Sequence, residues 1–384
     1  MIVMNVCSKH KPFDGRVYDK ISMCLVYYGY EVHNSSPNIQ DEYTKDGIYL
    51  HGFQQSPGII GRIGSSKNLL KLIEDVKPDC MICHEPDALW TAYRYYKREK
   101  KKRTIRLIFD CHEAYEYWYT KFNRLTPFNT VNKLVDRILF SRIKGTVKRI
   151  DAVTSVNNTM TEGYKNYNKH SYFLPSLNTN KYTVSELYNS KQDDLLVYYG
   201  QFGNSRQKEM FIGVAKILKS ESIKCKIAII GGERRKENAL QFTEEIKECG
   251  LEEYFEDLGW LDRDDAFDAL SKYQIGIMRF DSYLMPGNYA MPNKFFEYMA
   301  NGLAVLACKE NIELARIIND EKCGILIDTE DSESLVKGIK WALNHKEEIQ
   351  EMRHRALDAS KTKYNWDNYG KLLQKIVEGK YDEI

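Results

Sequence analysis

The chain has 384 residues, of which 43% are hydrophobic and 29% are charged. These proportions are typical of globular proteins and exclude fibrous and largely disordered classes, and the length allows two domains that each bury a core. No run approaches the ~18 to 20 apolar residues that a membrane-spanning helix needs, and the opening IVMNVCS has the pattern of a strand rather than of a targeting segment. We therefore expect a cytoplasmic protein.

The net charge of +2 conceals an asymmetry between the two halves of the chain. Residues 1–178 contain 27 Lys and Arg against 18 Asp and Glu, whereas residues 179–384 contain 29 against 36. A basic first half suits a pyrophosphate-bearing acceptor, an anionic lipid or the inner face of a membrane. Ordinary solvated surface explains any single basic run, such as residues 97–103, equally well.

The nine cysteines are an odd number spread mostly through predicted strands and helices, which indicates reduced thiols. Cys80 to His84 spell C-x-x-C-H, the spacing of covalent haem attachment. Because this run ends a buried-strand pattern in a chain without an export signal, we interpret the match as a coincidence. We expect no cofactor and no metal.

Short apolar runs alternate with helical patterns from end to end, which predicts parallel α/β units. The strands expected in the first half are IVMNVCS, EVHNSS, GIYLHGF, DCMICHE, LIFDCHE, AVTSV and SYFLPS. The helices expected there span residues 16–28, 65–76, 87–100, 113–149 with an interruption at Pro127, and 159–167.

A polar stretch without periodicity follows Pro175, and the α/β pattern then restarts. The strands expected in the second half are LLVYYGQF, KIAIIGG, DLGWL, QIGIMRF, LAVLAC and GILID. The helices expected there span residues 207–220, 236–249, 264–273, 291–302, 312–319, 332–363 and 366–378. The pattern predicts two successive domains, 1–178 and 179–365, and a final segment, 366–384.

The stretch 281–308 combines an irregular loop, a helix and a buried strand. The loop MPGNY (285–289) leads into a helix that we expect to begin near Met291, with Pro292 in its first turn. This helix is apolar nearly all round, but Asn293, Glu297 and Asn301 recur every four residues and form a polar stripe.

A carboxylate removed from water needs hydrogen-bond donors, so Glu297 is expected to meet either a protein cation or the hydroxyls of a ligand. The N-terminus of the same helix, with Lys294 in its first turn, is suited to an anion. A polyol joined to a phosphate describes a nucleotide sugar. Pairing of Glu297 with a buried Lys or Arg is the alternative.

Ligands of open α/β sheets bind at the carboxyl ends of the strands, so the loops after the strands are candidate sites. In the loop 10–16, Gly15 precedes a helix N-terminus and allows close approach of a phosphate or sugar, unless Asp14 simply caps the helix. Asp110, His112 and Glu113 follow another strand, as site residues or as a cap, a core histidine and a surface charge.

Two further patterns concern binding of sugars and phosphates. The aromatic run that includes Tyr115 and Tyr117 suits an acceptor sugar or lipid, although helix packing explains it nearly as well. After the strand LLVYYGQF, the Arg206 guanidinium has the fork geometry that two phosphate oxygens require. Gly231-Gly232 and Gly259-Trp260-Leu261 form two other strand-end turns.

The run PNKFFEYMANGLAVLA resembles the donor-site signature of family 4 glycosyltransferases of the GT-B fold. The segment 110–113 resembles that family's strand-end D-x-H-E, whose histidine lies near the transferred sugar. The segment 200–208 resembles its G-R-x-x-x-x-K-G run, whose two basic groups bind the diphosphate. Here those two positions hold Gln201 and Arg206, and Tyr289 replaces a Glu that the family often carries.

The resemblance implies two Rossmann-like domains facing across a cleft, with the C-terminal helix crossing back to the first domain. It implies retaining transfer of a sugar from a nucleotide-sugar donor, with UDP-sugar favoured, to a glycan or lipid-linked acceptor in surface polysaccharide biosynthesis. Metal-independent transfer is expected because no D-x-D stands at a strand end. Nucleic acid is not an expected partner.

The implied site residues fall into three sets. The catalytic residues are His112, Arg206 and Glu297. The donor-binding residues are Gly15, Gly203, Arg206, Gly232, Leu261, Asn288, Tyr289, Met291, Pro292, Asn293, Lys294 and Glu297. The acceptor-binding residues are Asp14, Arg16, Glu113, Tyr115 and Tyr117.

Two other functions remain compatible with the sequence. A UDP-sugar epimerase of the same fold would need acidic groups beside the sugar, and Asp110, Glu113 and Glu116 provide them. A non-catalytic nucleotide- or glycan-binding partner is motivated by Tyr289 and Gln201. A dinucleotide dehydrogenase is disfavoured because no G-x-G-x-x-G follows a strand.

Overall fold

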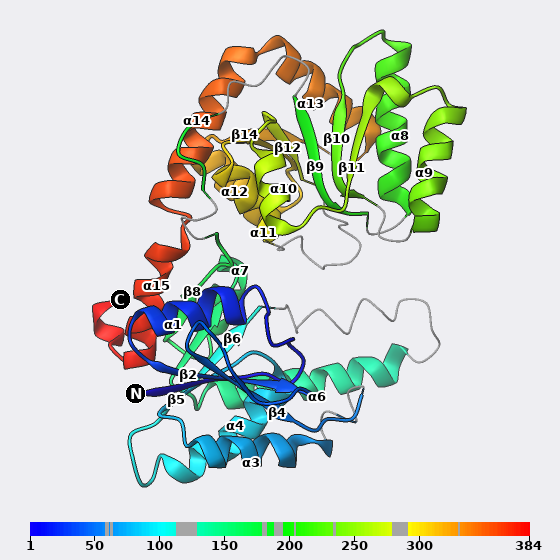
Figure 1. Cartoon of the computed structure of the whole chain (residues 1–384). Coiled ribbons are helices and arrows are strands. Elements are labelled where there is room, and N and C mark those ends of the chain that lie inside the picture. The colour runs from blue at the N-terminus through cyan, green and yellow to red at the C-terminus, as the bar shows by residue number, and fades with distance from the viewer. Residues whose placement is uncertain are drawn as a thin grey trace. The chain divides into compact units, whose positions relative to one another are not determined.

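The chain forms two compact α/β units (Figure 1). The computed structural model describes residues 1–57, 61, 64–112, 129–178, 183–187, 195–202, 205–232, 236–278, 291–328 and 331–384. Unit 1 comprises Met1–Ser176 and Trp366–Ile384, and unit 2 comprises Leu177–Asn365. The sequence placed the corresponding boundaries after residues 178 and 365.

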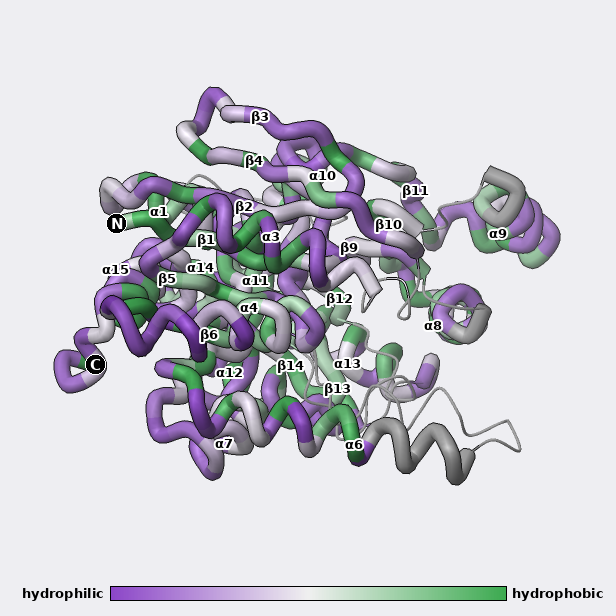
Figure 2. Tube along the Cα trace, turned by 90° about the horizontal axis from the view of Figure 1, so that it is seen from below, coloured by the Kyte–Doolittle hydropathy of each residue, from purple (hydrophilic) through white to green (hydrophobic). Residues whose placement is uncertain are grey.

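Unit 1 is built on an eight-stranded sheet in the order β3-β4-β2-β1-β5-β6-β7-β8. Its strands are β1 (Ile2–Val6), β2 (Glu31–Pro37), β3 (Glu42–Tyr43), β4 (Ile48–Phe53), β5 (Cys80–Cys83), β6 (Arg106–Cys111), β7 (Ala152–Ser155) and β8 (Ser171–Phe173). The edge strand β3 runs antiparallel to β4, whereas the other pairings are parallel. Both residues of β3 are exposed, and Figure 2 shows this edge as hydrophilic. The sequence did not predict β3, because two residues carry no periodicity.

Helices cover both faces of this sheet (Figure 1). They are the π-helix η1 (Val17–Ser22), α1 (Met23–Tyr27), α3 (Ser66–Val76), α4 (Pro86–Glu99), α6 (Asn129–Val147), α7 (Asn158–Lys165), α15 (Trp366–Glu378) and the 3-10 helix η4 (Tyr381–Glu383). Hydrophilic and hydrophobic residues alternate along α3 in Figure 2, because its inward face buries Leu69 and Ile73. The sequence predicted one helix over residues 16–28, whereas the structure has a π-helix followed by a short α-helix.

The last helix of the chain, α15, belongs to unit 1 and packs against η1 and α1. Its buried residues are Trp366, Gly370, Leu373, Ile376 and Val377. A Cβ on Gly370 would lie 2.9 Å from the sulfur of Cys24, so the two helices approach closely at this glycine. The hydroxyl of Tyr30 donates a 2.6 Å hydrogen bond to Glu378, which ties the end of α15 to the start of β2. The predicted return of the C-terminal helix to the first domain is therefore confirmed.

Unit 2 contains a fully parallel six-stranded sheet in the order β11-β10-β9-β12-β13-β14. Its strands are β9 (Leu196–Gln201), β10 (Ile227–Gly232), β11 (Phe255–Gly259), β12 (Ile275–Ile277), β13 (Ala304–Cys308) and β14 (Gly324–Ile327). In chain order this is the Rossmann arrangement 3-2-1-4-5-6, which reverses between β9 and β12. Unit 1 reverses in the same way between β1 and β5. Ligands of such sheets bind at these reversals, beyond the carboxyl ends of the strands.

The helices of unit 2 lie on both faces of its sheet (Figure 1). They are α8 (Ser205–Ser220), α9 (Lys236–Glu248), η3 (Glu252–Tyr254), α10 (Arg263–Leu270), α11 (Asn293–Ala300), α12 (Ile312–Glu321), α13 (Ser332–Asn344) and α14 (Lys346–Thr362). Helix α11 begins at Asn293, not near Met291 as predicted, because Pro292 has an extended ψ of 142° and is the N-cap. Among the described helices of both units, none is long and apolar enough to span a membrane.

The hydroxyl of Tyr298, on α11, joins β9 and β12 where these strands separate. The two strands pair only through Ile275 with Leu196 and Gly276 with Val197. Beyond that point the Tyr298 hydroxyl accepts a 2.8 Å hydrogen bond from the Tyr199 N–H and donates one of 3.2 Å to the Ile277 carbonyl. Gly276 is required beneath it, since a Cβ there would overlap the Tyr298 ring.

Replacing Tyr298 with Phe should destabilise unit 2, because the part-buried Tyr199 N–H loses its acceptor. Tyr298 is 0% exposed, and a buried donor without a partner costs about 1 to 3 kcal/mol. Urea unfolding of Tyr298→Phe beside the parent measures the loss. Tyr254→Phe is a matched control, because the hydroxyl of this buried tyrosine makes no hydrogen bond within the described residues. Equal stability of both variants would contradict the bridging role.

Candidate functional site

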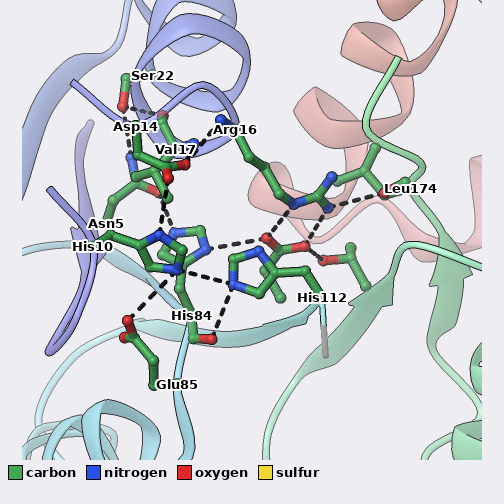
Figure 3. Close-up of polar contacts among 12 residues, drawn as sticks. Asn5, His10, Asp14, Arg16, Val17, Ser22, His84, Glu85, His112 and Leu174 are labelled. Atoms are coloured by element: carbon green, nitrogen blue, oxygen red, sulfur yellow. Dashed lines mark hydrogen bonds and ion pairs between the residues drawn. The ribbon is translucent and has the colours of Figure 1, made fainter. Parts of the chain in front are cut away.

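A cluster of histidines and carboxylates occupies the reversal point of the unit 1 sheet (Figure 3). His10 and Asp14 follow β1, His84 and Glu85 follow β5, and the segment after β6 contributes further side chains. The sheet topology therefore gathers residues that lie far apart in the sequence.

The centre of this cluster is the carboxylate of Asp110, which is 0% exposed. It accepts hydrogen bonds from Arg16 Nε (2.9 Å) and Nη2 (2.6 Å), from Thr154 Oγ1 (2.7 Å) and from His84 Nδ1 (3.1 Å). Burial alone would raise the pKa of Asp110, but the charge and hydrogen bonds of Arg16 and the bond from His84 hold it well below its ordinary value. Asp110 is therefore a buried, ionised and fully bonded carboxylate.

This network corrects the predicted roles of three residues in the first loop. The Arg16 side chain, expected to contact an acceptor, is 6% exposed and is held by Asp110 and by the Leu174 carbonyl at 2.9 Å. Asp14 accepts hydrogen bonds from the backbone N–H groups of Arg16 and Val17 at 2.9 and 3.0 Å, which matches the alternative interpretation as a helix cap. Gly15 is exposed, and a Cβ there would meet only Asp19 at 3.8 Å, so the turn does not require a glycine.

Two imidazoles face each other in the outer part of the cluster (Figure 3). His10 Nδ1 lies 3.1 Å from Asp14 Oδ2, and His10 Nε2 lies 3.2 Å from His112 Nε2. His112 Nε2 also lies 3.1 Å from the carbonyl oxygen of His84. Glu85 accepts hydrogen bonds from the N–H groups of Ser8 (2.9 Å) and Lys9 (3.0 Å), and its Oε1 lies 3.5 Å from His10 Nε2.

These surroundings shift the pKa values of His10 and His112 in opposite directions. Burial lowers the pKa of His112 to about 3, assisted by the charges of Arg16, His84 and His10 against the opposing charge of Asp110. Burial also acts to lower the pKa of His10, but the hydrogen bond to Asp14 and the charges of Glu85, Asp14 and Asp110 outweigh it and raise the value. At neutral pH His112 is therefore uncharged, whereas His10 retains a proton more readily than an ordinary histidine.

The ligating atoms of His84, Asp110 and His112 lie within 4.8 Å of one another, a spacing that a metal ion can bridge. The Asp110 carboxylate, however, already accepts four hydrogen bonds and faces the Arg16 cation. A metal ion would have to displace these donors and lie near a fixed positive charge. We therefore interpret the trio as a hydrogen-bonded network.

The sequence interpretation missed His84 and Glu85 as site residues. His84 had been considered only within C-x-x-C-H, but Cys80 and Cys83 are buried in β5. Their position directly after a buried apolar strand is the feature of the sequence that would have identified both residues as site candidates. What the sequence did not reveal was that β5 lies beside β1 at the sheet reversal.

In unit 2, Lys294 and Glu297 of α11 lie at the carboxyl end of β9. The Lys294 ammonium lies 5.8 and 5.9 Å from the ring centroids of Tyr198 and Tyr199. Gly200 has a φ of +142°, and a Cβ on it would overlap this ammonium, so the glycine makes room for the cation. Burial lowers the pKa of Lys294, and the negative charge of Glu297 opposes this shift. Burial, and after it the charge of Glu297, raises the pKa of Tyr199 to about 12.

A small pocket that is open to solvent lies beside Glu297. Its lining residues are Asn178, Tyr199, Arg263, Phe267, Leu270 and Glu297. Arg263 Nη2 lies 3.4 Å from Asn178 Oδ1, and the buried Asn178 Nδ2 makes no hydrogen bond to the part of the chain that the structure describes. Neither Asn178 nor Arg263 was predicted as a site residue, because one lies in the linker and the other in a helix opening.

Other donor-site predictions can be located, but the structure assigns them no role. Gly232, with a φ of +60°, ends β10, and its carbonyl accepts a 2.8 Å hydrogen bond from the Phe202 N–H. Leu261 is half-buried between β11 and α10, and Asn293 is exposed at the start of α11. Asn301 departs from the predicted stripe, because its side chain bonds back to the Glu297 carbonyl at 2.9 Å.

Several predicted site residues lie outside the described part of the chain. They are Gly203, Asn288, Tyr289, Glu113, Tyr115 and Tyr117. For Arg206 the backbone is described, as the second residue of α8 directly after β9, but its side chain is not. Met291 and Pro292 are half-buried residues that precede α11.

Comparison with known proteins identifies the architecture. Residues 184–362, nearly all of unit 2, match the family described as glycosyl transferases group 1. This part of the chain is therefore similar to group 1 glycosyltransferase domains. A comparison of the sequence with proteins of curated function gives no match.

Over both units, the chain resembles solved structures of the GT-B fold. A sucrose-phosphate synthase from Thermosynechococcus elongatus has a TM-score of 0.73 at 13% identity and covers 100% of this chain and 99% of its own. A glycosyltransferase from Rickettsia africae gives 0.70 at 14%, covering 100% and 97%. Anabaena HepE in complex with UDP-glucose gives 0.68 at 10%, covering 98% and 99%. The predicted GT-B fold, with two Rossmann-like domains, is therefore confirmed.

Removal of Arg16 should destabilise unit 1 strongly, because it leaves the buried Asp110 charge uncompensated. The expected loss for Arg16→Met is about 3 to 5 kcal/mol of unfolding free energy. Arg98→Met is the control, since Arg98 pairs with Glu74 on the surface at 50% exposure and such pairs contribute less than about 1 kcal/mol. Urea unfolding of both variants tests the difference, and a similar loss in each would refute the central role of the pair.

The depressed pKa of His112 should make the protein less stable in mild acid. The unfolded chain binds this proton near the ordinary histidine pKa of ~6.5, whereas the folded protein binds it only near 3. The resulting stability is therefore complete above pH ~6.5 and is lost toward pH ~3, by up to about 1.4 kcal/mol per pH unit. Between pH 7 and 5, Tm should fall less in His112→Gln than in the parent, and parallel curves would contradict this.

Proposed function

We propose that the protein transfers a sugar from a nucleotide-sugar donor, with UDP-sugar favoured, to a glycan or lipid-linked acceptor in surface polysaccharide biosynthesis. The observation that carries the proposal is the pairing of Lys294 and Glu297 on α11 beside Gly200, at the reversal point of a Rossmann sheet. Structural neighbours add support, since Anabaena HepE was solved with UDP-glucose and an E. coli protein with UDP-2-fluoro glucose.

The chemistry of unit 2 suits the two parts of such a donor. A carboxylate accepts hydrogen bonds from two neighbouring hydroxyls, so Glu297 can hold the ribose diol. Burial disfavours the charged form of Lys294 and the charge of Glu297 favours it, and a bound diphosphate would add negative charge that stabilises the ammonium further. The pocket next to Glu297 is lined by apolar side chains as well as by Asn178 and Arg263, which offer further contacts with the nucleoside.

Departure of the nucleoside diphosphate requires stabilisation of negative charge on its phosphates. In the proposed reaction, Lys294 and Arg206 supply this charge, together with the free N–H groups at the start of α11. The anomeric carbon exchanges its bond to the diphosphate oxygen for a bond to the acceptor hydroxyl oxygen, whose proton passes to the departing diphosphate, and the configuration is retained. No metal ion is required in this scheme.

Unit 1 is proposed to hold the acceptor and to place His112 near the transferred sugar. A membrane contact through the basic run 97–103 gains little support, because four of its cations are paired. Arg98 lies 2.7 Å from Glu74, Lys102 lies 3.2 Å from Glu99, Arg103 lies 2.8 Å from Asp79 and Lys100 lies 3.6 Å from Asp151. A lipid-linked acceptor would then be recognised mainly through its sugar and phosphate groups.

Calorimetric titration with UDP, GDP and ADP tests the donor site directly. We expect one nucleotide to bind with a micromolar Kd and the affinity to fall at least 10-fold in Glu297→Ala and in Lys294→Ala. Glu310→Ala, which removes an exposed carboxylate of the same unit, should bind like the parent. Absence of nucleotide binding, or equal binding by all variants, would refute the assignment.

Turnover assays then separate transfer from the two other functions. With the matching nucleotide sugar and a chelator such as EDTA, transfer to a glycan acceptor should continue at the untreated rate. Loss of turnover in the chelator would refute metal independence. Epimerised sugar formed without acceptor would indicate an epimerase, and tight nucleotide binding without any turnover would indicate a binding partner.

A further inference from the structure

The imidazole rings of His10 and His112, in unit 1, face each other through their Nε2 atoms. His10 Nε2 and His112 Nε2 lie 3.2 Å apart, which is hydrogen-bonding distance (Figure 3). A hydrogen bond between them needs a proton on one nitrogen and a lone pair on the other. The protonation of either ring therefore constrains the other.

Fixed acceptors around the pair determine where the protons lie. His112 Nε2 lies 3.1 Å from the His84 carbonyl, which can only accept, so this nitrogen carries the hydrogen. Because the pKa of His112 is lowered to about 3, the ring is neutral and its Nδ1 carries a lone pair. Nδ1 makes no hydrogen bond with any residue that the structure describes, and His112 as a residue is half-buried.

The other ring is oriented by a carboxylate. His10 Nδ1 lies 3.1 Å from Asp14 Oδ2, and Asp14 is itself fixed by the backbone N–H groups of Arg16 and Val17. An ionised carboxylate only accepts, so His10 carries its hydrogen on Nδ1. In neutral His10 the lone pair of Nε2 then accepts from His112 Nε2–H, and every group in the chain Asp14, His10 and His112 is satisfied.

We propose that His10 is a positioning residue that sets the tautomer of His112. While His10 is neutral, His112 stays protonated on Nε2 and its Nδ1 accepts a hydrogen bond from a sugar hydroxyl. A proton on His10 Nε2 would point at the proton of His112, so His112 gives up its bond to the His84 carbonyl, accepts from His10 on Nε2 and carries its hydrogen on Nδ1, which then donates. The sugar as ligand rests on the proposed function, whereas the coupling of the two rings does not.

The groups that face His10 set the pH at which the state changes. They are Lys9 and Asp14 from its own loop, Arg16 at the start of η1, His84 and Glu85 after β5, and Asp110 and His112 from β6 onward. Burial acts to lower the pKa of His10, and the surrounding carboxylates raise it above the ordinary value. Glu85 Oε1, at 3.5 Å, is positioned to stabilise the added proton.

The coupling has a consequence for specificity. A sugar hydroxyl both donates and accepts, so it can bind either tautomer of His112. A ring oxygen, a carboxylate or a phosphate oxygen only accepts and would bind only when His10 is protonated. Acidic conditions would thereby admit a class of contact that the neutral site rejects.

The test is nitrogen NMR of the full-length protein labelled with ¹⁵N-histidine, because tautomers differ in the shifts of the two ring nitrogens. The His112 signals should change from the Nε2–H to the Nδ1–H pattern as the pH is lowered from 8.5 to 5.5. In His10→Phe this change should disappear. In His354→Gln, which alters an exposed histidine of unit 2, it should remain.

A second variant keeps the test decisive if His10→Phe fails to fold. Asp14→Asn keeps an oxygen for the backbone N–H groups but turns an amide N–H toward His10 Nδ1, so neutral His10 carries its hydrogen on Nε2. The His112 signals of this variant should then show the Nδ1–H pattern already at pH 8.5. A parent His112 tautomer that is constant over the whole range, or an Nε2–H pattern at pH 8.5 in Asp14→Asn, would overturn the proposal.

A metal ion held by the facing rings would give a different result from proton coupling. Stoichiometric metal in the purified protein, with His10 and His112 signals that change on treatment with EDTA, would replace the proton coupling with a metal site and overturn the proposal. The NMR experiment uses no substrate. A protein that fails to bind nucleotide refutes the proposed function without affecting this result.

Discussion

A buried negative charge organises unit 1. The Asp110 carboxylate has lost its water, and such a charge is tolerated only where cations and hydrogen-bond donors replace the solvent. Its donors come from the start of η1, from the loop after β5 and from β7. One side chain therefore fixes the relative positions of three segments. These positions in turn determine how the rings of His10 and His112 are oriented toward each other.

In unit 2, two glycines leave space for side chains of α11. Gly276 leaves room for the Tyr298 ring, whose hydroxyl joins the separating strands, and Gly200 leaves room for the Lys294 ammonium. Both glycines lie at the strands that border the sheet reversal. The helix α11 can therefore bring a cation and a carboxylate close to the backbone of β9.

The α/β order of the chain was predictable because buried parallel strands are continuous apolar runs that loops and helices interrupt. The sequence also led to Glu297, through the polar stripe on an apolar helix, and to Lys294, through its place in the first turn of that helix, because both are local patterns. The partner of Asp110 was not predictable, because Arg16 lies 94 residues away and looks like a surface cation. Asn178 and Arg263 were missed for the same reason, since only tertiary packing brings them to one pocket.

The return of α15 to unit 1 has a consequence for biosynthesis. Residues 1–176 leave the ribosome first, but their unit lacks Trp366–Ile384 until all of unit 2 has been made. At roughly 5 to 20 residues per second, that interval lasts on the order of 10 to 40 s. During this interval the surface of α1 that will contact Gly370 is uncovered. The newly made residues of unit 1 therefore depend on chaperones, or on their own solubility, for longer than unit 2, whose residues are contiguous in the sequence.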